Sequence, residues 1–424
     1  MPSTSGYPNT TEDNPASAWI YLDRWFRMAV DHPIRTNWLA HADTCYAFEQ
    51  GDQWSAAEKS ELHLRNQPPI VENEIRPSKE RLIGQFRRQH TTVKYLGRNK
   101  PDEQMANDYS DLHRQIDYVN GYPFVEAEVA NDMLISGVGW MEVCVKDNEL
   151  GQPQVRYRRE DPFAVFWDPF SRAYDINEDA RFLCRSKWLY EDDAINIWGV
   201  EKAGQIAQCI STSQPSASVL SLLDPDVLAN RNWWNLYFDK RNGRFRPVEI
   251  WYKKRVTEKV IETKEGIKTV ITDKNKKAVK DAIEELPGAL ITERSVDKLW
   301  VAVYCGGIIL DGPKPYPYGD LFPLIPYWAY RKADGEPQGW VWGLIDPQRE
   351  INGRRSKAVW SFNNRQTIFE RNAIADKQNL AVEVARPDGQ IELEPGKFDK
   401  FKMAAIFRYQ ILLLLDSFAL KMVV

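Results

Sequence analysis

The sequence predicts an α+β protein whose sheets are antiparallel. Apolar residues at helical spacing fill the first part of the chain, strand-like runs rich in β-branched and aromatic residues occupy the middle, and a long amphipathic helical pattern begins at Asp346. Hydrophobic residues make up 43% of the 424 residues and charged residues 27%, as in ordinary globular proteins. These values exclude collagen-like and fully disordered chains, and the length corresponds to about three structural units.

The amino-terminal part of the chain predicts a loose tail followed by helices. The opening MPSTSGYPNTTEDNPAS has neither a basic start nor an apolar centre, so it does not resemble a secretory signal. Helical spacing begins at Ala18–Met28, and Asp52–Leu64 is rich in helix formers. Pro77 opens a further helix, and the helix predicted from Glu126 ends near Gly137 and passes into a strand.

The middle of the chain predicts antiparallel strands. Short strand-like segments occur at VRYRRED, AVFWD and ARFLCRSKWL, with turn residues between them. From Phe245 the run RPVEIWYKKRV predicts another strand, and the Gly306-Gly307 pair predicts the turn of a hairpin. The proline-rich stretch DGPKPYPYGDLFPLIPYW interrupts regular structure. We therefore expect residues 245–330 to form a compact, strand-rich insertion module.

The helix predicted from Asp346 to Arg371 is the most informative element. Asp346 is a good N-cap, Pro347 suits the first helical position, and the helix would be roughly 39 Å long at about 1.5 Å per residue. One side gathers Ile351, Ala358, Phe362 and Phe369, and the other carries Arg349, Lys357 and Arg371, with Arg354 and Arg365 flanking the apolar stripe and Arg355 within it. Two interpretations stay open: a surface helix over the core of its own domain, or a helix whose apolar side needs a partner surface.

Charge and missing motifs exclude several classes of protein. The net charge of -4 argues against a protein that clamps nucleic-acid phosphates tightly. The phosphate-binding loop G-x-x-x-x-G-K-[ST], H-E-x-x-H and G-x-S-x-G are absent. The five histidines and five cysteines show no metal-ligand spacing, and no run of eighteen apolar residues predicts a transmembrane helix. Asp175–Asp179 begins like a calcium loop but lacks its glycine and its last glutamate, so a turn is the better interpretation. We expect no catalytic residue, no metal and no cofactor.

Three motif-bearing stretches follow one another along the chain. The first is YAFEQGDQW followed by IVENEIRPSKERLIGQFRR. The second is NDMLISGVGWMEV with EDPFAVFWDPFSRAYDINEDARFL, and the third is FPLIPYWAYRKADGEPQGWVWGLIDPQREINGRRSKAVWSF, which contains D-x-Q-R-x-x-N-x-x-x-S. In their joint order and spacing these stretches resemble the portal proteins of tailed bacteriophages, specifically the large podovirus-type portal family.

The resemblance implies a portal fold with a wing, a β-rich clip and a long channel-lining stem helix, and with crown and barrel regions absent or truncated. Carried over by position, it divides the chain into a flexible amino-terminal tail (1–25), a wing of mixed helices and strands (26–240), a clip (241–335), the stem or channel helix (336–372), and a return to the wing with the start of a truncated carboxyl-terminal helix (373–424). No clear stem helix precedes the clip, and Ser216–Phe238 is the candidate for it.

The resemblance also implies a function. The chain would be a structural, non-enzymatic head-tail connector that forms a ring, usually of twelve copies, at one capsid vertex. A separate terminase would drive double-stranded DNA through the ring, and the genome would later leave by the same route. The expected partners are further copies of the chain, DNA held weakly and without sequence specificity, the terminase large subunit, the major capsid and scaffolding proteins, and tail adaptor proteins, with no membrane. We expect assembly in the host cytoplasm and residence in the virion at the capsid vertex.

On this interpretation the stem helix carries two kinds of site residue. The DNA-channel candidates are Arg349, Arg354, Lys357, Arg365 and Arg371, and the inter-subunit packing candidates are Ile351, Ala358, Phe362 and Phe369. Because a channel must hold DNA weakly, we expect several of these arginines, Arg354 and Arg365 first, to pair with acidic residues of the neighbouring copy. The alternatives are another structural adaptor of the virion and a nucleic-acid-processing enzyme, which a nucleotide-hydrolysis assay would separate from a portal.

Overall fold

The computed structural model describes residues 15–88, 92–148, 150–212, 234–262, 268–270 and 290–363. The chain divides into two compact units. Unit 1 comprises Met1–Gly51 and Asn73–Ile345, and unit 2 comprises Asp52–Glu72 and Asp346–Val424. The described residues combine helices with antiparallel sheets, as the sequence predicts.

Several helices and strands lie where the sequence predicts them. The expectation that the proline-rich stretch 311–328 interrupts regular structure is wrong in part, because strands Ile308–Pro315 and Leu324–Trp328 extend into it, and both are edge strands, where proline is tolerated. The described helices are α1 (Pro15–Asp31), α2 (Pro33–Gln50), α3 (Ala56–Leu64), α4 (Ile75–Arg88), α5 (Glu103–Asn120), α6 (Tyr122–Ser136), α7 (Ile176–Asp179), α8 (Glu191–Trp198), α9 (Val200–Thr212) and α13 (Ile345–Asn363). The described strands are β1 (Val138–Asp147), β2 (Pro153–Glu160), β3 (Val165–Trp167), β4 (Phe182–Ser186), β5 (Leu189–Tyr190), β6 (Phe238–Asp239), β7 (Arg244–Phe245), β8 (Val248–Glu262), β9 (Lys268–Val270), β10 (Leu290–Cys305), β11 (Ile308–Pro315), β12 (Leu324–Trp328), β13 (Tyr330–Arg331) and β14 (Pro337–Gln338).

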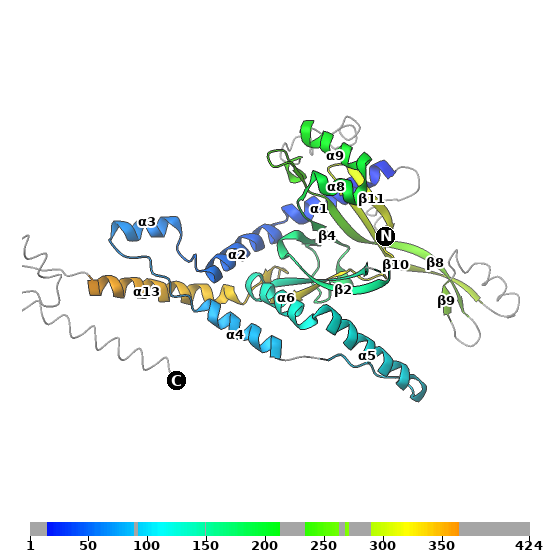
Figure 1. Cartoon of the computed structure of the whole chain (residues 1–424), viewed down its shortest axis with the longest axis horizontal. Helices are drawn as coiled ribbons and strands as arrows, with labels where there is room; N and C mark the ends of the chain where they lie inside the picture. The colour runs from blue at the N-terminus through cyan, green and yellow to red at the C-terminus, as the bar shows by residue number, and fades with distance from the viewer. Residues whose placement is uncertain are drawn as a thin grey trace, which may run out of the picture. The chain divides into compact units, whose positions relative to one another are not determined.

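Unit 1 contains two main sheets between two sets of helices (Figure 1). The first sheet has the strand order β12-β1-β2 and packs against α6, and the second has the order β11-β10-β8-β4-β3, with β9 paired to β8. Alternate residues of the second sheet enter different cores, because side chains alternate between the faces of a strand. Phe182 and Cys184 of β4 face the core beneath α1, α8 and α9, whereas Leu183 faces the core shared with the first sheet. Small sheets β13-β14 and β5-β7-β6 complete the unit.

Glycines connect elements at the two places where the sequence predicts them. α6 ends at Ser136, and Gly137 follows in the left-handed region with φ 92° before β1 begins. Gly306 (φ 52°) and Gly307 (φ 94°) link β10 to β11, so that the residues on either side of the pair lie opposite each other. A two-residue hairpin turn of this kind requires positive φ at both central residues. The hairpin prediction is therefore confirmed.

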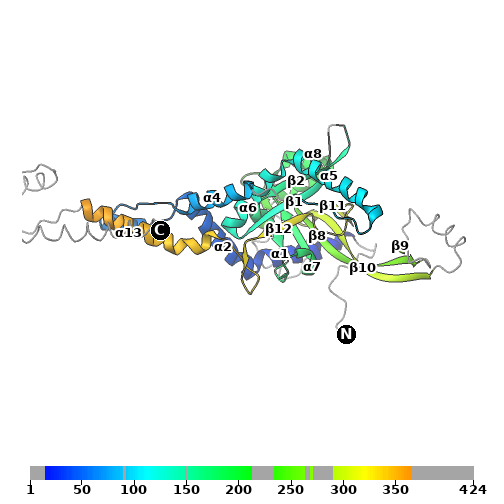
Figure 2. The same ribbon diagram turned by 90° about the horizontal axis from the view of Figure 1, so that it is seen from below.

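The strand-rich module predicted at 245–330, and the clip range 241–335 with it, shares its sheets with the preceding region. β8 pairs with β10 along its whole length, and its first residues also pair with β4, where Tyr252 lies opposite Phe182. β12 pairs with β1, with Trp328 opposite Val138. The distal parts of β8 and β10, with β9, extend beyond β4 (Figures 1 and 2). The strand pattern predicts these strands but not their neighbours, because alternation specifies the buried face and not the adjacent strand.

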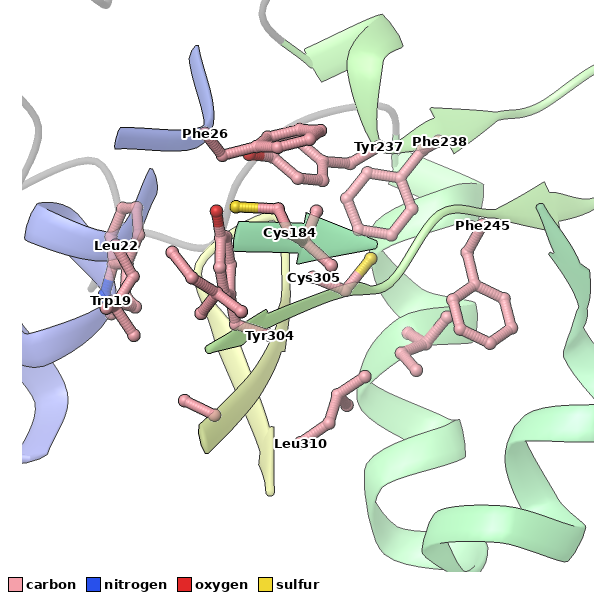
Figure 3. Packing of buried hydrophobic residues seen from close by; sticks show 14 of the residues in the cluster. Trp19, Leu22, Phe26, Cys184, Tyr237, Phe238, Phe245, Tyr304, Cys305 and Leu310 are labelled. Carbon is pink, nitrogen blue, oxygen red and sulfur yellow. The ribbon is translucent and has the colours of Figure 1, made fainter. Parts of the chain in front are cut away.

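The boundary expected for the amino-terminal tail is wrong. α1 already begins at residue 15, and its Trp19, Leu22 and Phe26 are buried in the largest core (Figure 3). In Figure 3 these three side chains point toward strands of the second sheet. The helical spacing that the sequence shows from Ala18 is thus confirmed. The composition of the opening residues hides the boundary, because a polar segment can run directly into an amphipathic helix.

Four tryptophans from distant segments fill the core between the two main sheets. Trp38 of α2 packs edge-to-face on Trp167 of β3, with ring centroids 5.5 Å apart. Trp328 of β12 lies 5.9 Å from both Trp167 and Trp140 of β1. Trp140, Trp167 and Trp328 come from the second and third motif-bearing stretches. Those motifs therefore meet in one packed cluster, where large aromatic rings contribute strongly to folding.

Candidate functional site

Helix α13 is the described part of the predicted channel helix. It begins at Ile345, directly after the 3-10 turn Val341–Leu344, so Asp346 lies within the first turn and not at the N-cap. The expected cap is wrong because helical backbone is already established in the preceding turn. From Asp346 onward the helix belongs to unit 2, together with Asp52–Glu72. The part predicted beyond Asn363 lies outside the described residues.

The buried face of α13 is polar. Gln348, Asn352 and Ser356 follow one another at four-residue spacing, and each is at most 2% exposed. The Asn352 side chain donates to Gln53 Oε1 (2.5 Å), and its Oδ1 accepts from Gln348 Nε2 (3.0 Å). The same Oδ1 accepts the backbone N–H of Glu72 (3.0 Å). A helix face of this kind is stabilised by hydrogen bonds rather than by apolar packing.

The polar face also bonds the backbone of the segment that lies along it. Gln348 Nε2 donates to the carbonyl of Glu72 (2.6 Å), and Ser356 Oγ donates to the carbonyl of Pro68 (2.5 Å). Residues 67–72 belong to no helix or strand, so their backbone groups have no regular ladder of partners and take some of them from α13. We call Gln53, Gln348, Asn352 and Ser356 the polar seam.

The short helix α3 of the same unit has a complete capping box. Ser55 accepts the N–H of Glu58 (3.2 Å), and the N–H of Ser55 donates to the Glu58 carboxylate (2.8 Å). This backbone hydrogen bond, with help from the Ser55 hydroxyl and Arg349, holds the pKa of Glu58 below its usual value, against a smaller opposing effect of burial. A lowered carboxylate pKa stabilises the fold above the usual glutamate range, and this stabilisation is lost as the pH falls through the folded-state pKa.

Replacing Asn352 with leucine should loosen the 52–72 segment from α13. Leucine has a similar size but leaves the N–H of Glu72 and the amides of Gln53 and Gln348 with fewer partners inside a buried seam. We expect a loss of about 2 kcal/mol of stability and at least tenfold faster hydrogen exchange at the Glu72 amide. Hydrogen-exchange mass spectrometry of the purified chain measures both.

The matched control is Ser361→Ala on the same helix. Ser361 is exposed, and its one hydrogen bond within the described residues is a donation to the carbonyl of Lys357 (2.8 Å), so its loss should leave exchange in residues 52–72 unchanged. Unaltered protection of the Glu72 amide in Asn352→Leu would show that the seam does not hold the segment.

Three of the five predicted DNA-channel residues lie in the described part of α13. Arg349, Arg354 and Lys357 are exposed and lie outside the buried polar face. The other two, Arg365 and Arg371, lie outside the described residues. Arg349 lies 3.5 Å from Asp346, and Arg354 forms an ion pair with Glu350 one turn earlier on the helix. Pairing of Arg354 with a neighbouring copy stays a prediction.

The predicted inter-subunit residues occupy a different side of the helix from the polar seam. Ile351 and Ala358 are half-buried, Phe362 is 52% exposed, and Phe369 lies outside the described residues. Their packing against a neighbouring copy stays a prediction. The exposed ring of Phe362 leaves apolar area that an assembly could cover.

The sequence contained a signal for the polar seam that helical-wheel reasoning about apolar residues passed over. In D-x-Q-R-x-x-N-x-x-x-S the glutamine, asparagine and serine are Gln348, Asn352 and Ser356, spaced i, i+4 and i+8 on one helical face. Gln53 lies in the first motif-bearing stretch, within YAFEQGDQW. Two motifs far apart in the sequence therefore meet at the seam.

The described residues contain no arrangement that suits a metal ion or a membrane. No group of three or more His, Cys, Asp or Glu side chains among them could hold a metal. Asp175, in the calcium-like sequence, instead accepts the N–H of Asn177 (2.9 Å) and begins α7, which confirms the interpretation of this segment as a turn. Within the described ranges, no helix is both long and apolar enough to cross a bilayer.

Comparison with known families decides what kind of protein carries this helix. The family model for the phage P22-like portal protein matches residues 23–410. The chain belongs to the phage P22-like portal protein family. No curated protein matches it. As a portal protein, it is a structural head-tail connector of the capsid vertex, and the resemblance found in its three motif-bearing stretches is confirmed.

Family membership gives the polar seam and the tryptophan cluster a setting. Portal proteins are structural and assemble as ring oligomers with DNA and with capsid and terminase partners. The described motif residues have structural roles of this kind. Trp140 packs in a hydrophobic core, and Asn352 hydrogen-bonds Gln53 in the polar seam.

Proposed function

We propose that copies of this portal protein close into a ring, twelve in number, and that α13 lines the channel through which double-stranded DNA passes. The observation that supports this most is that one side of α13 is buried and polar whereas another side is exposed and basic. Its polar seam is buried against residues 53–72, while Arg349, Arg354 and Lys357 are exposed. A helix fixed along one side and charged on another suits the wall of an aqueous channel.

The charge balance of unit 2 fits a channel that holds DNA weakly. Over the described residues 52–72 and 346–363 there are six basic and six acidic side chains, counting Lys and Arg against Asp and Glu. Arg355 also has an acidic neighbour, Glu72, at 3.3 Å. DNA carries about one charge per 1.7 Å, and a ring repeats each basic residue once per copy, so unbalanced arginines would hold the duplex too tightly to move. Acidic neighbours reduce that grip.

The remaining regions take the roles that the family suggests. The wing begins with α1 and extends to residue 240, residues 241–335 form the clip, and residues 336–372 form the stem. Residues 373–424, expected to return to the wing, lie outside the described residues. The clip meets the terminase large subunit and later the tail adaptor proteins, and the major capsid and scaffolding proteins surround the ring. The long β8-β10 ribbon beyond β4 supports an outward-reaching clip. We assign no catalytic activity to the chain, and assembly takes place in the host cytoplasm.

A Glu350→Gln variant tests the channel assignment. Removing this carboxylate leaves Arg354 of every copy without its acidic neighbour on the helix. We expect rings that bind duplex DNA about tenfold more tightly at low salt, with a steeper loss of affinity as salt rises. Negative-stain imaging should show a closed ring with a central hole, and fluorescence anisotropy over a salt series measures the affinity.

The matched control is Glu61→Gln on α3. Glu61 forms the same type of exposed i,i+4 ion pair, with Arg65, on α3 and not on α13. It should leave DNA affinity unchanged. Equal effects of the two substitutions would contradict the assignment of α13 to the channel wall, and a chain that forms no ring would contradict the proposed function as a whole.

A further inference from the structure

Helix α5 packs on its own chain through its polar side. Ala106 and Ser110 are buried there. Asn120 donates to the carbonyl of Val155 (3.0 Å) and accepts the N–H of Tyr157 (3.3 Å), which ties the end of the helix to strand β2. The side of α5 that faces its own chain therefore carries small side chains and hydrogen-bonding groups.

The apolar side of α5 faces solvent. Met105, Tyr109, Leu112 and Val119 recur at helical spacing over roughly 21 Å, and each is more than half exposed. We call these four residues the α5 stripe. A surface helix of a globular protein normally turns its apolar stripe toward a core. An exposed stripe of this length marks an interaction surface.

A second exposed apolar group lies elsewhere on unit 1. Phe170, Tyr174 and Tyr330 are each at least 60% exposed, with Tyr174 at 77%. Arg331 links their segments by donating to two backbone carbonyls of the loop 170–174, at 2.6 Å each. We call Phe170, Tyr174 and Tyr330 the aromatic cluster.

The α5 stripe and the aromatic cluster belong to opposite edges of one sheet. In the order β12-β1-β2, α5 is tied to β2 by Asn120, whereas Trp328 of β12 donates to the carbonyl of Tyr174 (3.1 Å). Figure 2 shows α5 near β2, and α7, which follows Tyr174 in the chain, on the side of β12. A closed ring of identical copies joins two different surfaces, one on each side of the subunit. These two surfaces meet that requirement.

The α5 stripe and the aromatic cluster are flanked by opposite charges. Asp108 of α5 flanks the stripe, and Arg172 lies between Phe170 and Tyr174 in the sequence; both are exposed. Arg172 donates to the backbone carbonyl of Ala333 (2.5 Å), and among the described residues the structure places no opposite charge in an ion pair with either side chain. An acidic flank on one surface and a basic one on the other favour a single relative orientation.

We propose that the α5 stripe of one copy packs against the aromatic cluster of the next copy, with Asp108 facing Arg172. The proposal rests on the ring of the proposed function and names the surfaces that join its subunits. Aromatic side chains are enriched at the centres of protein interfaces, because they bury a large area at small entropic cost.

Cysteine cross-linking tests the contact directly. Leu112→Cys and Tyr174→Cys are placed together in the full chain, with Cys144→Ser as background because Cys144 is the one native cysteine that is not buried. Copper–phenanthroline oxidation of assembled rings should give a ladder of linked chains on a non-reducing gel, up to the full ring. Each single-cysteine variant should stay monomeric on the same gel.

The outcomes separate this interface from the ring itself. Closed rings that give no ladder would overturn the interface and leave the proposed function standing. Dimers from Leu112→Cys alone would show two α5 stripes meeting each other and would also overturn it. An unmodified chain that never forms a ring would overturn both the proposed function and this inference.

A charge exchange gives an independent measurement. Asp108→Lys should lower the fraction of chain in rings about tenfold at a fixed low concentration, as should Arg172→Asp. The double variant should recover most of the loss, because it restores an opposite pair across the same contact. Losses that merely add in the double variant would contradict the pairing. Mass photometry counts rings and monomers directly.

Discussion

A Gly139→Ala variant is expected to lose about 3 kcal/mol of folding stability, although it adds a single methyl group. A Cβ atom at Gly139 would lie 2.1 Å from the carbonyl oxygen of Val129 and 2.9 Å from its Cγ1. These atoms belong to α6, which packs directly on β1, so the whole helix would have to move off the sheet. Backbone cannot move aside as the end of a flexible side chain can, and protein interiors are close-packed. Urea denaturation followed by circular dichroism measures the loss.

Gly84→Ala is the matched control for Gly139→Ala. Gly84 lies within α4, and a Cβ atom there would meet nothing within 4 Å. Alanine favours helix over glycine, so this variant should gain about 0.5–1 kcal/mol. A Gly139→Ala protein as stable as the original would show that α6 does not approach β1 as closely as the structure has it.

An Arg185→Met variant should lose about 3 kcal/mol because it leaves three carboxylates without their shared cation. Arg185 of β4 donates to Glu142 Oε1 and Glu249 Oε2 at 2.6 Å each, and to Glu160 Oε2 at 3.1 Å. These acids come from β1, β2 and β8, so one guanidinium joins the two main sheets. Burial alone would lower the pKa of Arg185, but Glu249, Glu142 and Glu160 together raise it above its usual value.

Removing carboxylates from the Arg185→Met variant gives a second measurement. Adding Glu142→Gln and Glu160→Gln removes two of the three charges that lose their shared cation, so it should recover part of the loss. Differential scanning calorimetry of the variants measures the recovery.

An exposed ion pair provides the control for Arg185→Met. Arg255 and Asp297 lie 3.0 Å apart on the β8-β10 ribbon, and both side chains are more than 40% exposed. Arg255→Met should change stability by less than about 1 kcal/mol, because water screens such pairs. An equal loss in both variants would contradict the role given to the Arg185 cluster.

Local elements of this portal protein follow from residue spacing and turn residues. The passage from α6 through Gly137 to β1, and the Gly306-Gly307 hairpin, are predictable because each depends on neighbours in the chain. The sharing of β8 between β4 and β10 was not predictable in that way. A strand buried on both faces carries no mark of which strand lies beside it.

The candidate site also has some features that the sequence predicts and others that only the tertiary structure determines. The motif-bearing stretches predicted the family, which the family model confirms. Residue spacing predicted a long charged helix from Asp346, and α13 is its described part. The burial of Gln348 and Asn352 depended on the tertiary structure, because polar side chains on a helix ordinarily face water. They are buried here because the backbone of Glu72, 276 and 280 positions away from Gln348 and Asn352, has no ladder of its own and takes their hydrogen bonds. The spacing of Gln348, Asn352 and Ser356 on one helical face is visible in the sequence. It does not show that this face is buried, because the demand for hydrogen bonds arises in a distant segment of the chain.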